Sequence, residues 1–155
     1  MPISDSVTPS EWKQPGTYVL ILEMEADQAV PIGRLGTFDL RRGWYAYVGS
    51  AFGSGGLRGR LKHHLTPPAR PHWHIDYLRA AATVREVWYS ASSTPYEHEW
   101  ASALRSLPQT TIPIPRFGAS DCRCAAHLFH FDQYPDLTTF HLATHPTKLS
   151  SCRIE

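Results

Sequence analysis

The chain has 155 residues, of which 42% are hydrophobic and five are tryptophans. This is enough apolar material for one sizeable core, so we expect a single domain over residues 1–155, with a core at about 15–131 and a tail at 132–155. The sequence has neither a secretory leader nor a run of about 18 apolar residues, which excludes a membrane span and favours a soluble, cytoplasmic protein. The three cysteines are an odd number, and two of them stand too close to bridge without strain, so a disulfide framework is not expected.

Positive charge is concentrated in the middle of the chain, although the net charge is only +1. Residues 34–70 hold seven Arg or Lys against one acid, Asp39, and aromatic residues such as Trp44 and Phe52 are interleaved with them. A basic and aromatic segment is typical of a surface that neutralises phosphates and stacks on bases. An ordinary solvated cationic face would have the same composition.

The first elements in chain order are predicted to be strands. Residues 17–24 are rich in β-branched and aromatic side chains and indicate a strand after a frayed start. Further strands are expected at 30–35 and 43–48, because each apolar run stops at a glycine, Gly36 or Gly49. These three strands would form an antiparallel meander.

Helices are predicted to follow and to cover this sheet. Leu57, Leu61 and Leu65 recur every four residues and mark the buried stripe of a short helix that ends before Pro67-Pro68. Further elements are expected downstream, namely helices at 72–82 and 95–107 and a strand at 83–89. The pattern therefore predicts an α+β fold, with helices packed on a small antiparallel sheet.

Four side chains are candidates for one site at the edge of the sheet. Tyr18 begins one predicted strand and Tyr47 ends another, so adjacent strands could bring the two phenols together. Arg60 and His64 are four residues apart on the helix that follows, and they project from one face of it.

These residue types suit the hydrolysis of a phosphodiester bond. A tyrosine with an ordinary pKa near 10 accepts a proton from water at neutral pH only if about 4 kcal/mol of added stabilisation favours its phenolate. Arg60 could contribute to that stabilisation and could also bind the negative charge on phosphorus. A glutamate on the third predicted helix, Glu97 or Glu99, would supply the carboxylate that a hard cation such as Mg²⁺ prefers.

Several blocks of the sequence resemble a known family. The tripeptides GTY at 16–18 and YVG at 47–49 resemble the two halves of the GIY-YIG nuclease signature, and GLRGRL at 56–61 resembles its helix with the catalytic arginine. The longer blocks GWYAYVGSAFGSGGLRGRLKHHL, HWHIDYL and FGASDCRCAAHLFHF are similar to an uncharacterised subfamily of GIY-YIG-like domains. That subfamily is sometimes fused to base-excision endonucleases of the endonuclease III type.

The resemblance implies a small three-stranded antiparallel sheet flanked by helices, and one divalent cation, Mg²⁺ or Mn²⁺, on a helical glutamate. Tyr47 would be the general base, Tyr18 its hydrogen-bonding neighbour and Arg60 the ligand of the scissile phosphate. His64 occupies the place of a tyrosine or histidine that supports the same phosphate. Glu99 would hold the metal ion, because its surroundings are similar to a motif of structure-specific relatives, with Glu97 as the alternative.

Two features differ from the family pattern. Residues 30–42 are expected to form an inserted β-hairpin, whose turn carries Arg34 and could shape the substrate cleft. Ser50 stands where some relatives have a lysine. Arg58, and less so Lys62, are further candidates for substrate contacts, with solvated side chains as the alternative.

Two other clusters allow a metal-binding interpretation. His72, His74 and Asp76 could share an ion, but a helix cap or a local hydrogen bond is the favoured interpretation.

The second cluster is Cys122, Cys124 and His127. A closed zinc site would need a fourth ligand, so buried structural cysteines, with Asp121 capping the next segment, are favoured and zinc is not expected.

The sequence thus predicts a metal-dependent endonuclease that acts on DNA, with a role in DNA repair and a repair protein as a possible partner. One alternative is a nucleic-acid-binding module that keeps the fold but has lost turnover. Another is a zinc or thiol protein centred on Cys122, Cys124 and His127.

Overall fold

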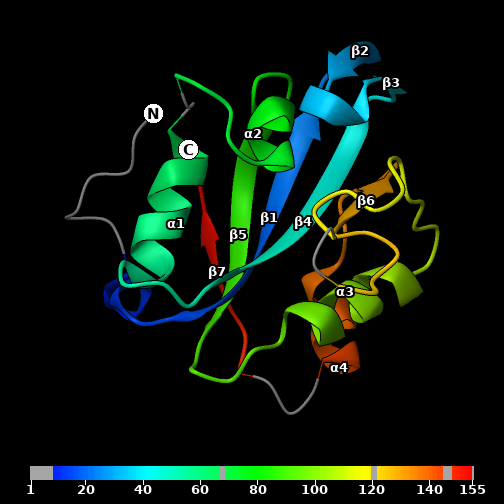
Figure 1. Ribbon diagram of the computed structural model, residues 1–155. Coiled ribbons are helices and arrows are strands. Elements are labelled where there is room, and N and C mark those ends of the chain that lie inside the picture. Colours follow the sequence, from blue (N-terminus) through cyan, green and yellow to red (C-terminus); the bar gives the residue numbers. More distant parts are fainter. Residues whose placement is uncertain (1–8, 67–68, 120–121, 145–147, 155) are drawn as a thin grey trace.

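The computed structural model describes residues 9–66, 69–119, 122–144 and 148–154. Within these residues, five antiparallel strands form one sheet in the order β6-β4-β1-β5-β7 (Figure 1). The strands are β1 (Gly16–Met24), β4 (Gly43–Ala51), β5 (Thr83–Ala91), β6 (Leu128–Phe131) and β7 (Ser150–Arg153). The expected helix end at Pro67-Pro68 and the expected cap at Asp121 lie outside the described residues.

The mixed α+β class is confirmed, but the expectation of a small three-stranded sheet is wrong. The strands β6 and β7 come from the last third of the chain and extend the sheet at its two edges, where β6 pairs with β4 and β7 pairs with β5. Each has only four residues, which is too short for the apolar periodicity of the sequence to indicate a strand.

The predicted meander is also wrong, because its middle strand does not join the main sheet. Residues 28–31 (β2, Gln28–Pro31) and 37–40 (β3, Thr37–Leu40) pair with each other as a separate hairpin. A short 3-10 helix, η2 (Gly33–Leu35), lies at its turn, and Gly33 and Gly36 have positive φ. This turn reverses the chain before it can continue as a strand of the main sheet.

Three helices lie close to their predicted places, namely α1 (Gly56–Leu65), α2 (His74–Arg79) and α3 (Glu97–Ser106). Two others, η1 (Ser10–Lys13) and α4 (Leu137–Ala143), were not predicted. Trp12 in η1 is only 1% exposed, so this part of the expected frayed start is packed into the core. Phe140 of α4 is fully buried, so the expected tail contributes to the core.

Both faces of the sheet are buried. Tyr18 and Leu20 of β1 pack with residues of η1, α1 and α2, whereas Val19 and Ile21 pack with residues of α3 and α4. Helices α1 and α2 lie on one face of the sheet, and α3 and α4 lie on the other (Figure 1). Successive side chains of a strand alternate between faces, so a strand that is buried on both sides reads as a continuous apolar run. No helix in the described ranges is long and apolar enough to cross a membrane.

Gly16 is required by the close approach of a neighbouring strand. Gly16 pairs with Ala91 of β5, and a Cβ atom at position 16 would overlap the backbone carbonyl oxygen of Ser90. A backbone atom cannot move aside as a flexible side chain can. The glycine of the GTY tripeptide therefore has a packing role.

We expect Gly16→Ala to lower the free energy of unfolding by about 1–3 kcal/mol, because the added methyl group forces β1 and β5 apart. Gly53→Ala is the matched control, since a Cβ atom at position 53 would meet nothing within 4 Å. Urea unfolding at neutral pH measures both. Equal stabilities of the two variants would contradict this account of Gly16.

Candidate active site

The register between β1 and β4 brings the two tyrosines together. Tyr18 lies opposite Gly49 and Leu20 lies opposite Tyr47, so the two phenols are diagonal neighbours on one face of the sheet. A Cβ atom at Gly49 would lie 2.5 Å from the Tyr18 hydroxyl oxygen. Gly49 thus leaves the space that the phenol of Tyr18 fills.

His64 of α1 lies over the same face. Its Nε2 atom and the Tyr18 hydroxyl share a buried hydrogen bond of 2.6 Å, and its ring centroid is 6.1 Å from that of Tyr47. The Nε atom of Arg79 donates to the backbone carbonyl of His64 at 2.6 Å. Helix α1 is therefore tied to both the tyrosines and α2.

Arg60 lies one turn before His64 on α1. Its guanidinium carbon is 4.5 Å from the ring centroid of Trp73, a cation–π arrangement that holds the guanidinium in place. Trp73 is partly buried, packs against the core and supports Arg60.

Arg60 is also the site residue that reaches a groove of about 300 Å³, which the glycine-rich loop at 53–56, His63 and Trp73 line with it. A larger groove of about 630 Å³ lies at the opposite end of β1 and β4, among residues such as Glu23, Asp27 and Arg41. The smaller groove is the one that adjoins the candidate site.

Both phenols are neutral at physiological pH in this environment. Burial, with smaller contributions from Tyr47 and Glu97, raises the pKa of Tyr18 well above its usual value. Burial and the charge of Glu97 also raise the pKa of Tyr47, whereas Arg60 lowers the pKa of each phenol. Tyr47 is the more accessible of the two, because Tyr18 is only 1% exposed.

The structure brings Glu97, rather than Glu99, to the tyrosines. The buried residue Trp100 fixes the inner face of α3, and Glu97, three residues earlier, lies on that side while Glu99 is exposed. The Oε2 atom of Glu97 accepts a hydrogen bond of 3.2 Å from the Ser50 hydroxyl, and Oε1 lies 3.3 Å from Nδ1 of His127. Ser50 thus positions this carboxylate.

Glu97 is ionised at neutral pH. Burial alone would raise its pKa, but the close approach of His127 and the hydrogen bond from Ser50 outweigh that effect and lower it. The short motif around Glu99 did not indicate that Glu97 is the glutamate on the inner side of α3, because side-chain direction depends on which face of the helix is buried.

The other candidate substrate contacts are spread over two elements. Arg58 and Lys62 are on α1 with Arg60, and Lys62 is exposed. Arg34 is exposed in η2, on the separate hairpin rather than on the strands that carry the tyrosines.

The cluster at His72 and Asp76 forms a helix cap. The Asp76 carboxylate is buried, and it accepts hydrogen bonds from the backbone N–H groups of His72 and Trp73 at 2.8 and 2.9 Å. It also lies 3.0 Å from Nε2 of His63. His74 accepts a hydrogen bond of 3.3 Å from the backbone N–H of Gly118, which ties α2 to the segment before β6.

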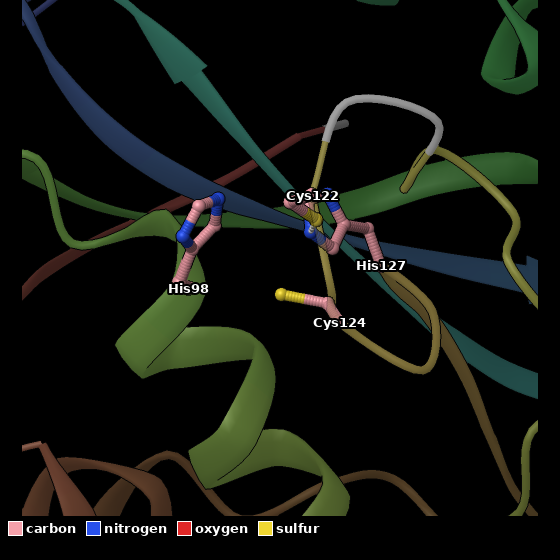
Figure 2. A group of neighbouring side chains, drawn as sticks. All are labelled: His98, Cys122, Cys124 and His127. Atoms are coloured by element: carbon pink, nitrogen blue, oxygen red, sulfur yellow. Dashed lines mark hydrogen bonds between the residues drawn. The ribbon is translucent and has the colours of Figure 1, made fainter.

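The cluster at Cys122, Cys124 and His127 gains a fourth member that the sequence did not indicate, His98 of α3 (Figure 2). Burial and Cys122 raise the pKa of the Cys124 thiol to about 11, so the thiol is protonated at neutral pH. That argues against Cys124 as a catalytic nucleophile.

Protonation of His64 is expected to couple stability to pH. Burial lowers its pKa to about 3, compared with about 6.5 in the unfolded chain. Between these values only the unfolded chain binds the proton, so the free energy of unfolding falls as pH falls, by of the order of 3 kcal/mol at about pH 4.

His64→Gln removes this term, so the variant should lose less stability than the parent between about pH 7 and pH 4. Urea unfolding at both pH values measures the difference, with His72→Gln, which changes an exposed side chain, as the control. An unchanged pH dependence in His64→Gln would show that this histidine is not buried in its neutral form.

Residues 17–149 match the protein family described as a domain of unknown function, DUF123. No curated protein and no solved structure matches the chain. The match covers most of the 155 residues and includes both tyrosines, Arg60, His64 and the cysteine segment. The chain therefore belongs to the DUF123 family.

Proposed function

We propose that the protein is a metal-dependent endonuclease of the GIY-YIG type that hydrolyses DNA phosphodiester bonds. One observation carries the proposal. Tyr18, Tyr47 and His64 meet on one face of the sheet, with Arg60 one helical turn away beside an open groove. The ionised carboxylate of Glu97 is close enough to raise the pKa of both phenols.

Glu97 fits the requirements of a Mg²⁺ or Mn²⁺ ligand. Mg²⁺ is often bound by one or two carboxylates and completes its coordination with water and substrate phosphates. The Glu97 side chain is 26% exposed, so a carboxylate oxygen can be reached from solvent. A cation bound there would neutralise the charge that develops on the leaving oxygen.

Arg60 is suited to bind the scissile phosphate. Its guanidinium offers a planar set of donors that matches two phosphate oxygens, and stacking on Trp73 limits its motion. The groove that it lines also contains the N-terminus of α1, where the positive end of the helix dipole favours an anion.

Tyr47 is the candidate general base, since it is partly exposed and can meet water. Its raised pKa means that its phenolate forms only when further positive charge enters the site. Proton abstraction would thus be confined to the site loaded with cation and substrate. Tyr18 and the neutral His64 form a buried hydrogen-bonded pair that holds the neighbouring side chains in register.

A second candidate function is a nucleic-acid-binding module without turnover. Both oxygens of Glu97 already have partners, Ser50 and His127, which favours this alternative. Such a module would show an affinity for DNA that falls steeply with salt and would cleave no substrate with any divalent cation.

We expect Glu97→Gln to reduce cleavage by at least about 100-fold and to leave DNA binding largely intact, because the charge that holds the cation is lost. Glu99→Gln, on the same helix but exposed, should cleave like the parent protein. The measurement is a screen over labelled linear, flap and branched DNAs with Mg²⁺ or Mn²⁺, with Arg60→Ala beside them.

Loss of cleavage in Glu99→Gln but not in Glu97→Gln would reverse the assignment of the metal ligand. Equal cutting by Arg60→Ala would exclude this site as the active site. Salt-dependent binding without cleavage in every combination would support the binding module instead.

A further inference from the structure

We propose that His98, Cys122, Cys124 and His127 bind a Zn²⁺ ion at a structural site separate from the proposed nuclease cation. One ligand atom from each residue lies within 4.8 Å of the other three. His98 comes from the first turn of α3, and the other three come from the segment that leads into β6 (Figure 2). The side chains point toward a common centre from two parts of the chain.

The distances are close to those of a tetrahedral site. Bonds of about 2.0–2.3 Å from zinc to nitrogen and sulfur require ligand atoms to be about 3.3–3.8 Å apart. Cys122 Sγ and His127 Nε2 are 3.4 Å apart and already match. The widest separation in the cluster exceeds this range by about 1 Å. Small rotations of the ligand side chains would close a gap of this size, and His98 is the exposed one among them.

The donor set selects the ion. Two thiolates and two imidazoles suit Zn²⁺, whereas Mg²⁺ and Ca²⁺ prefer oxygen. The two thiolates would also neutralise the charge of the ion. Cys122, Cys124 and His127 come from one short segment, but His98 comes from α3, so the Cys-x-Cys segment does not have to supply all four ligands.

The surroundings of His127 are a second, independent indication of a metal ligand. Its Nδ1 atom is buried without a hydrogen bond of good geometry, and the Glu97 carboxylate lies 3.3 Å from it. Metal-binding histidines commonly direct their second ring nitrogen at a carboxylate, which fixes the ring orientation and leaves the first nitrogen free for the metal. Here that arrangement leaves Nε2 facing Cys122.

A filled four-ligand site leaves no open position for a substrate, which is typical of structural zinc. The ion would join α3 to the irregular segment that connects α3 with β6. Phe117 of that segment packs against Tyr47, with ring centroids 6.1 Å apart, and the backbone N–H of His127 donates to the carbonyl of Phe117 at 2.8 Å. Zinc would therefore fix one wall of the tyrosine site.

The test is metal analysis of the full-length purified protein, followed by spectroscopy of its Co²⁺-substituted form. We expect one zinc ion per chain after gel filtration. The cobalt form should show the intense visible bands of a tetrahedral ion together with a thiolate-to-cobalt charge-transfer band. A protein that holds no zinc and gives no such spectrum would overturn the proposal, and neither measurement needs a variant.

Variants assign the ligands. Cys122→Ser, Cys124→Ser and His98→Gln should each weaken zinc binding, whereas Cys152→Ser should not, because Cys152 lies on β7 outside the cluster. Glu97→Gln, which removes the carboxylate beside His127 but none of the four zinc ligands, should lower zinc affinity by about 10–100-fold. Unchanged zinc affinity in His98→Gln and Cys124→Ser would contradict the site. Because the readout is zinc rather than cleavage, the result is independent of the proposed nuclease activity.

Discussion

The pairing of β1 with β4 is the constraint on which the candidate site depends. In this register Tyr18 faces Gly49, and the missing side chain at position 49 is the space in which the phenol lies. The phenol can then reach His64, and the diagonal position brings Tyr47 to the same face. A slip of one residue would turn one tyrosine to the opposite face, toward α3 and α4. The glycines and tyrosines of the two tripeptides thus pack together and depend on the same strand register.

Glu97 connects the two proposed metal sites. One of its oxygens accepts from Ser50 at the end of β4, and the other lies beside His127. The two sites differ in the chemistry of their donors, because a carboxylate and substrate phosphates suit a hard cation and thiolates suit zinc. An ion on His127 would also strengthen the hold of that ring on Glu97. Zinc binding would in this way position the carboxylate that the proposed hydrolysis requires, without entering the reaction.

Long periodic segments of the sequence predicted their structure well, whereas features that arise from tertiary contacts did not. The strand at 17–24 and the leucine stripe of α1 were identified because each element carries its own pattern. The four-residue strands β6 and β7 carry too little pattern, and they are strands only because β4 and β5 offer free edges. The direction of Glu97 depends on the burial of Trp100. His98 joins the cysteines only through the docking of α3, which no local spacing indicates.

The most direct test of the central claim, that a divalent cation binds on Glu97 beside the tyrosines, is a titration of ¹⁵N-labelled, zinc-loaded protein with Mn²⁺. Paramagnetic broadening reports which amides lie near the ion. The account predicts that the signals of Tyr47, Ser50 and Glu97 broaden first, that Asp39 on the separate hairpin is unaffected, and that Glu97→Gln abolishes the effect. Broadening centred on the acidic groove at the opposite end of β1, or broadening that persists in Glu97→Gln, would contradict it.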